Sequence, residues 1–199
     1  MFYYQRAGFA KVPPFADPRW ADGASHIGPL QDLDCRSVLA PGGPGLDLSG
    51  GWYDAGDYNK YVNFTDGVLQ DLLSAYQVNP EAWDDAAGIQ ESGNGIPDLL
   101  DEVRWGLDWM LRMQRPGGGL LHKVSVADYS AASPPSADLA QRLYAPITAS
   151  ATASGAAAFA RGAIVFRELP DAGSQAFASV LEAAALDAWN WLLLNPAFS

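Results

Sequence analysis

The sequence of 199 residues holds a single cysteine, Cys35. One cysteine cannot form an intrachain disulfide, and it excludes a zinc site built mainly from thiolates. No uninterrupted run approaches the roughly 20 apolar residues that a membrane-spanning helix needs, so we expect no membrane partner. No signal peptide is visible, because the first residues lack a basic segment followed by an apolar one. We therefore expect either an intracellular protein or a natural N-terminus that lies upstream of this sequence.

Positive charge is also scarce. The chain has 12 basic residues against 23 acidic ones and a formal net charge of −11. Such a chain repels polyanions, so we expect no nucleic-acid partner. Among the acidic residues glutamate is rare, and only five are present: Glu81, Glu91, Glu102, Glu168 and Glu182.

Aromatic residues, in contrast, are abundant. They make up 12% of the chain and include seven tryptophans, while 49% of all residues are hydrophobic. This composition is enough for the core of one compact domain. Most aromatic side chains are expected in that core, as are the tryptophans at helical positions: Trp105, Trp109, Trp189 and Trp191. The others could stack on the C–H face of a sugar ring.

Helical periodicity begins only after residue 61, because the first part of the chain is rich in proline, glycine and aspartate. The pattern of apolar residues and end signals predicts four helices, over about 63–78, 97–115, 148–168 and 171–195. No strand alternation is evident, although residues 120–124 could be extended. The sequence therefore predicts an all-α fold of helical hairpins that stack side by side.

Residues 50–61 (GGWYDAGDYNKY) are the most unusual stretch of the chain. Asp54 and Asp57 are separated by Ala55 and Gly56, whose small size lets the backbone turn sharply and leaves room for a ligand or water. Two carboxylates held close together can orient one water, and one of them can take its proton as the water attacks. The alternative is a solvated Asp-Gly turn whose carboxylates accept hydrogen bonds from their own backbone. The flanking aromatic residues favour a functional site without excluding the turn.

Four stretches resemble, in the same order, the catalytic domain of family 9 glycoside hydrolases, the cellulase family. The segment 50–61 is similar to that family's GGWxDAGD signature, and 2–6 (FYYQR) to the start of the domain. Residues 91–107 (ESGNGIPDLLDEVRWGL) resemble the loop and helix after the signature, and 118–124 (GGLLHKV) the segment beyond that helix. Residues 1–199 are therefore interpreted as the N-terminal portion of a single glycoside hydrolase catalytic domain.

The resemblance implies an (α/α)6 barrel, a toroid of six helical hairpins, of which this chain covers only the first part. It also implies inverting hydrolysis of β-1,4-glycosidic bonds in cellulose or a related β-glucan, with Asp57 as general base and Asp54 assisting. A glutamate acts as general acid near the far end of the family's domain, and no glutamate here matches that position. We therefore expect the acid to lie outside this chain, so the isolated chain should be inactive and should need the remainder of the catalytic domain as its partner.

Further site residues follow from the same resemblance. The histidine that matches His122 hydrogen-bonds the sugar in the family, whereas a histidine after a glycine turn can also simply cap a loop. From their places in the sequence, Trp52, Tyr53, Tyr58 and Tyr61 could line the substrate groove beside the two aspartates. Tyr53 and Tyr58 adjoin the aspartates, so we expect at least one of them to contact the β-glucan or oligosaccharide substrate.

The chemistry itself should require no cofactor. The loop with Glu91, Asn94, Asp98 and Asp101 offers several hard oxygen ligands, and the family often binds structural calcium in this region. Helix capping explains Asp98 and Asp101 equally well without a metal.

A structural zinc site found in some relatives near His26 is expected to be lost. Ala7, Ser25 and Lys60 stand where its ligands would be sought.

Two other functions stay open on the sequence. One is an exo-acting hydrolase of cello-oligosaccharides or glucosamine oligomers. The other is a non-catalytic carbohydrate-binding protein on the same fold. The family implies an extracellular location, and a cytoplasmic one is the alternative.

Overall fold

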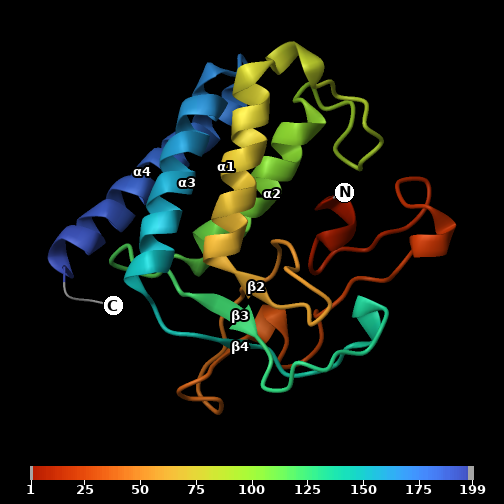
Figure 1. The fold of residues 1–199 in the computed structure, drawn as a ribbon, viewed down its shortest axis with the longest axis vertical. Coiled ribbons are helices and arrows are strands. Elements are labelled where there is room, and N and C mark those ends of the chain that lie inside the picture. Colours follow the sequence, from red (N-terminus) through yellow and green to blue (C-terminus); the bar gives the residue numbers. More distant parts are fainter. Residues whose placement is uncertain (1, 197–199) are drawn as a thin grey trace.

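The computed structural model describes residues 2–196, and their main elements are four α-helices. These are α1 (Val62–Val78), α2 (Asp98–Met113), α3 (Ala149–Glu168) and α4 (Ala172–Leu194). Helix α3 packs against both α4 and α1, and α1 packs in turn against α2, so the helices form one row (Figure 1). All four predicted helices are confirmed to within a few residues.

The ends of these helices have local causes in the sequence. The side chain of Thr148 accepts a hydrogen bond from the backbone N–H of Ala151 and caps α3, and Asp171 caps α4 through Ser174. Pro97 immediately precedes α2, where a missing N–H costs nothing.

Besides the α-helices, the described residues form a small sheet. It consists of β1 (Arg36–Ser37), β2 (Lys60–Tyr61), β3 (Lys123–Ser125) and β4 (Leu143–Tyr144) in the order β1-β4-β3-β2. β3 is antiparallel to both β2 and β4, while β1 and β4 are parallel. The strictly all-α prediction is therefore wrong in this part of the molecule, because strands of two or three residues are too short to show alternation.

Single turns of 3-10 helix occur in the irregular segments. They are η1 (Phe2–Gln5), η2 (Pro18–Trp20), η3 (Asp32–Asp34), η4 (Pro80–Ala82) and η5 (Pro135–Ala137).

The sheet lies below the row of helices, next to the N-terminal ends of α1 and α3 (Figure 1). β2 runs directly into α1, and Lys60 of β2 pairs with Val124 of β3. This arrangement places the segment 54–59, which immediately precedes β2, at the first turn of α1.

The core fills the space between the helices and this irregular layer. Leu69 and Leu73 of α1 and Leu107 of α2 are fully buried there, as are Phe159 and Phe166 of α3. Trp52 and Trp109 join the same cluster, so the segment around residue 52 is packed directly onto the helices.

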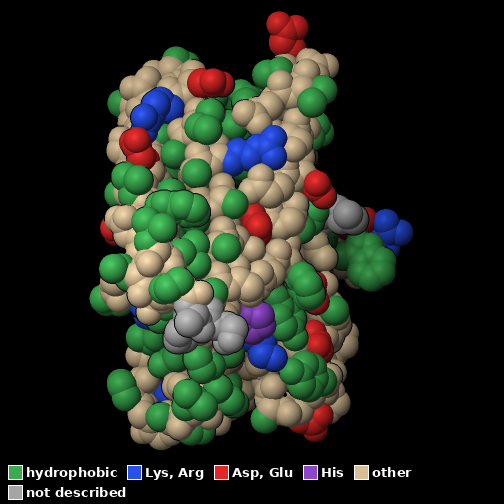
Figure 2. All heavy atoms as spheres, turned by 60° about the vertical axis from the view of Figure 1, so that its left-hand side comes forward, with side chains coloured by type: hydrophobic (Ala, Val, Ile, Leu, Met, Phe, Trp, Pro, Cys, Tyr) green, Lys and Arg blue, Asp and Glu red, His purple; other side chains and the backbone are tan. Residues whose placement is uncertain are grey.

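The outer face of α3 and α4 is apolar but uncovered (Figure 2). Trp189, expected in the core, is 56% exposed there, and Ile164, Leu186 and Leu193 are also exposed. Within the described residues, α4 alone is long and apolar enough to cross a membrane by length and composition, and only 28% of its most apolar window is buried. One such helix is weak evidence for a membrane segment, since a helix that packs on two sides in a protein core has the same composition.

The contact between Trp52 and α2 gives a test of the packing. A Cβ built on Gly106 would lie 2.5 Å from the Trp52 ring, whereas a Cβ on Gly67 of α1 would meet nothing within 4 Å. In a protein with the complete catalytic domain, we expect Gly106→Ala to destabilise the fold by about 1–3 kcal/mol through overpacking. Gly67→Ala should instead stabilise it by about 0.5–1 kcal/mol, because alanine favours the helix. Denaturant unfolding measures both, and equal effects of the two changes would contradict this packing.

Candidate active site

The two aspartates of the signature lie on one closed turn. The backbone N–H of Asp54 donates to the carbonyl of Asn59 (2.9 Å), and the N–H of Tyr58 donates to the carbonyl of Ala55 (3.0 Å). Tyr58 has a φ of 56°, in the left-handed region that a tight reversal requires. The side chain of Asp54 is exposed and that of Asp57 is half-buried. The turn therefore presents both carboxylates from a fixed backbone.

A cavity of about 80 Å³ opens beside Asp54. Its walls come from the N-terminal turn, the signature segment and the start of α1: Phe2, Gln5, Trp52, Tyr53, Asp54, Tyr61, Phe64, Thr65 and Val68. A cavity of this size has room for a few water molecules, since one water takes up about 30 Å³ in the liquid. Carboxylate, water and aromatic surface can thus meet at one place.

The surroundings of Asp54 disfavour its charged form. Partial desolvation raises the pKa of Asp54, and the negative charge of Asp57 raises it further. A second carboxylate nearby disfavours the charged form of the first.

The aromatic residues beside the aspartates differ in how they are placed. Trp52 and Tyr53 are buried members of the cavity wall. The Trp52 indole N–H donates to Glu102 (3.1 Å), and the Tyr53 hydroxyl contacts the Ser25 hydroxyl (2.6 Å). Tyr58 is half-buried, and its ring packs 5.1 Å from that of Tyr53, between centroids. The polar groups of Trp52 and Tyr53 are thus occupied by protein, which leaves ring surface for contact with a ligand.

His122 lies next to the end of the signature segment, since its carbonyl accepts a hydrogen bond from the N–H of Val62 (3.2 Å). Its ring is 6.3 Å from that of Tyr61, which lines the cavity, and its Nδ1 is buried without a hydrogen-bond partner. Burial lowers the pKa of His122, and the neighbouring Lys123 charge lowers it further, so the ring is neutral at neutral pH. A neutral imidazole can donate or accept a hydrogen bond, as a sugar hydroxyl requires. The Nδ1 of His122 is closed to solvent, however, and His122 is not among the residues that line the cavity beside Asp54.

A buried ionic cluster supports the turn from behind. Asp32 lies 2.6 Å from the Lys60 ammonium and 3.0 Å from the Arg142 Nε, and all three side chains are fully buried. Burial alone would raise the pKa of Asp32, but the two cations outweigh it, so the pKa is lowered. Arg142 also donates to the carbonyl of Tyr58 (2.6 Å). No sequence pattern marks this cluster, since its members are far apart in the chain.

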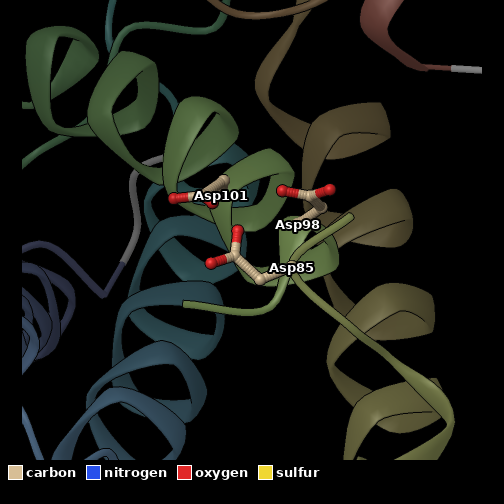
Figure 3. Close-up of side chains that lie close together, drawn as sticks. All are labelled: Asp85, Asp98 and Asp101. Carbon is tan, nitrogen blue, oxygen red and sulfur yellow. The ribbon is translucent and has the colours of Figure 1, made fainter. Parts of the chain in front are cut away.

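A second group of carboxylates lies at the corner between the α1–α2 loop and α2. Asp85, Asp98 and Asp101 each offer an oxygen within 4.8 Å of the others (Figure 3). Asp98 and Asp101 belong to the predicted calcium ligands, whereas Asp85 was missed because no motif marks it within its acidic loop. The side chain of Asp98 is 4% exposed, and its Oδ1 has no hydrogen-bond partner.

The other two predicted calcium ligands have protein partners. Asn94 donates its amide to Asp101 (3.1 Å), and Glu91 pairs with Arg6 (2.8 Å). The second oxygen of Glu91, Oε2, is buried without a partner. Of the three aspartates only Asp98 has an oxygen without a partner, because both oxygens of Asp85 accept backbone N–H groups and both oxygens of Asp101 accept from Asn94. Hard carboxylate oxygens suit calcium, which Asp85, Asp98 and Asp101 would hold. The ion would have a structural role, because none of these three residues lines the cavity beside Asp54.

This chain has relatives among known proteins. Residues 1–197 match the family model "Glycosyl hydrolase family 9". A xyloglucan-specific endo-beta-1,4-glucanase of Bacteroides ovatus is 40% identical over 62% of this chain and 22% of its own length. A cellodextrinase of Butyrivibrio fibrisolvens is 30% identical over 98% of this chain and 34% of its own length.

Solved structures match the fold as well. The crystal structure of a metagenome-derived glycoside hydrolase family 9 endoglucanase superposes with a TM-score of 0.85 at 39% identity, covering 97% of this chain and 34% of that one. A Bacteroides ovatus family 9 structure gives a TM-score of 0.87 at 30% identity, covering 98% of this chain and 36% of that one.

Glycoside hydrolases cleave their substrate with carboxyl groups at the scissile bond, and a carboxylate beside an aromatic-lined cavity is compatible with that class. Within that class, this chain belongs to glycosyl hydrolase family 9. The chain spans about a third or less of the length of the relatives described here.

The group of Asp85, Asp98 and Asp101 leads to a prediction about how stability depends on pH. Burial raises the pKa of Asp101 from 3.8 to about 6, and the charges of Glu91, Asp98 and Asp85 contribute. The folded state therefore binds this proton more tightly than the unfolded state, so stability falls as the pH rises from about 4 to about 6 without a cation. In chelator at pH 7, Asp101→Asn should stabilise a protein with the complete domain by roughly 1–2 kcal/mol, and at pH 4 it should have little effect.

Calcium should make the unaltered protein more stable than Asp101→Asn, the reverse of the ranking in chelator. At about 100 times its dissociation constant it should stabilise the unaltered protein by about 2.7 kcal/mol, and Asp101→Asn should remove most of that gain. Thermal melts with calcium or chelator measure the effect, with Asp84→Asn in the same loop as a control that leaves the three oxygen ligands in place. An unaltered melting temperature in excess calcium would contradict the site.

Proposed function

We propose that this chain supplies the water-activating half of the active site of an inverting β-1,4-glucan hydrolase. Asp57 acts as general base, and Asp54 helps to hold the attacking water. The observation that carries this proposal is the closed turn that holds both carboxylates, together with the aromatic-lined cavity that opens beside Asp54. Asp57 lies on the same turn, although it is not among the residues that line this cavity. A water between them can attack the anomeric carbon while Asp57 takes its proton.

The general acid comes from a part of the catalytic domain outside this chain. Two glutamates of the chain have other partners, because Glu102 binds Arg6 and Trp52 while Glu91 also pairs with Arg6. Glu81, Glu168 and Glu182 are exposed and do not line the cavity beside Asp54. In an inverting enzyme the acid stands about 6.5–9.5 Å from the base, which leaves room for the water below the sugar ring.

The remainder of the domain packs on the outer face of α3 and α4. Two adjoining grooves of about 400 and 360 Å³ run along this face, and both are lined by Ala160, Ala185 and Leu186. Small residues let another helix approach closely, and the exposed apolar side chains there need cover. Such packing extends the row of helices toward the six-hairpin (α/α)6 barrel.

The substrate is a β-1,4-glucan cleaved internally, as the names of the endoglucanase relatives suggest. An exo-acting mode on cello-oligosaccharides is the second candidate, because the cellodextrinase of Butyrivibrio fibrisolvens aligns over nearly the whole chain. A protein with the complete domain should lower the viscosity of a soluble β-glucan much faster than it releases reducing ends. Release of reducing ends without this early fall would favour the exo mode.

Replacement of the base tests the proposal itself. In the complete domain, Asp57→Ala should reduce turnover by at least about 100-fold, the usual range for loss of a general base, while oligosaccharide affinity stays similar. Asp71→Ala, an exposed aspartate on α1, is the matched control and should keep full activity. Initial rates on a soluble glucan and calorimetric binding provide the two measurements. Retained turnover in Asp57→Ala would reject Asp57 as the general base. Sugar binding without turnover in the unaltered complete domain would instead favour the carbohydrate-binding role.

A further inference from the structure

We propose that Asn59 is the positioning residue for the general base, and that it fixes Asp57 and Asp54 in one common frame. This inference rests on the proposed role of Asp57. Asn59 does not line the cavity beside Asp54, and its side chain is fully buried.

Both oxygens of the Asp57 carboxylate are held by this one residue. The side-chain amide of Asn59 donates to Oδ2 at 2.8 Å, and its backbone N–H donates to Oδ1 at 3.3 Å. A carboxylate held at a single oxygen can still rotate about its Cβ–Cγ bond, whereas two donors on the same side fix its plane. The lone pairs on the opposite side stay available for water.

The orientation of the Asn59 amide is itself determined by the fold. Its Oδ1 accepts a hydrogen bond from the buried backbone N–H of Val126 at 3.2 Å. A flipped amide would place an N–H against this N–H donor and an oxygen against the Asp57 carboxylate, so both contacts would be lost. Val126 directly follows β3, so the sheet sets the direction from which Asn59 reaches the base.

The backbone of Asn59 connects the same frame to the second aspartate. Its carbonyl accepts the N–H of Asp54, which closes the turn, and Arg142 holds the preceding carbonyl of Tyr58. The spacing between the two carboxylates therefore depends on Asn59 at both ends. A displacement of about 1 Å in a catalytic group can cost about 100-fold in rate, so this anchoring is expected to appear in turnover.

Two variants of Asn59 separate positioning from folding. Asn59→Asp keeps the shape and the acceptor for Val126 but replaces the donor to Asp57 by an oxygen. Asn59→Ala removes both side-chain contacts. Asn63→Ala is the control. This change also removes an asparagine hydrogen bond, the one to Ser154 of α3, but Asn63 bonds neither aspartate.

The measurements are kcat and KM on a soluble β-glucan, with melting temperatures and Asp57→Ala alongside, all in a protein with the complete domain. We expect both Asn59 variants to lower kcat by about 10–100-fold, with KM unchanged within about twofold, and Asn63→Ala to keep both values. A merely structural role would move the melting temperature without this selective loss of kcat.

The outcomes distinguish this inference from the proposed function. If Asp57→Ala is inactive while Asn59→Asp, still folded, keeps kcat within about threefold, Asp57 remains the base and the positioning role is rejected. A rise in KM at constant kcat would also reject it, since that marks lost substrate binding. If Asp57→Ala stays active, the proposed function itself fails.

Discussion

The hydrogen bonds between Asn59 and the two signature aspartates are the interactions on which this account of the site depends. The Asn59 carbonyl closes the turn at Asp54, and its amide holds the Asp57 carboxylate. Behind the turn, a fully buried ion pair between Lys60 and Asp32 and a bond from Arg142 to the Tyr58 carbonyl connect it to the interior. An exposed loop of small residues would otherwise sample many conformations, so the catalytic geometry comes from its buried neighbours.

The helical part of the fold could be predicted from the sequence because its signals are local. Apolar residues recur with helical period, and Thr148, Asp171 and Asn79 with Pro80 mark the ends. The sheet could be predicted only in part: residues 120–124 could be extended, and β3 is Lys123–Ser125, whereas the other strands and the pairing were not indicated. Its strands are two or three residues long, and they form only because the chain brings residues near 36, 60, 124 and 143 together.

In the site, too, local sequence patterns could be predicted, whereas contacts between distant residues could not. Asp54 and Asp57 stand out in the sequence because the small residues and aromatics around them are contiguous. Asp32 and Arg142, in contrast, are separated by more than a hundred residues, and their pairing depends on the fold. Trp189 was expected in the core because its helix is apolar, yet its exposure reflects an outer face that the described residues do not cover. Sequence patterns indicate which faces are apolar, but they do not say what packs on them.

The central claim is that Asp54 and Asp57 hold one water against the sugar ring. Its most direct test is a crystal structure of the complete catalytic domain with an unreacted cello-oligosaccharide across the cavity. The account predicts one ordered water within hydrogen-bond distance of both carboxylates and in line with the anomeric carbon, on the side away from the glycosidic oxygen. A sugar bound in the cavity with Asp57 directed away from the anomeric carbon and no water between the two aspartates would contradict it.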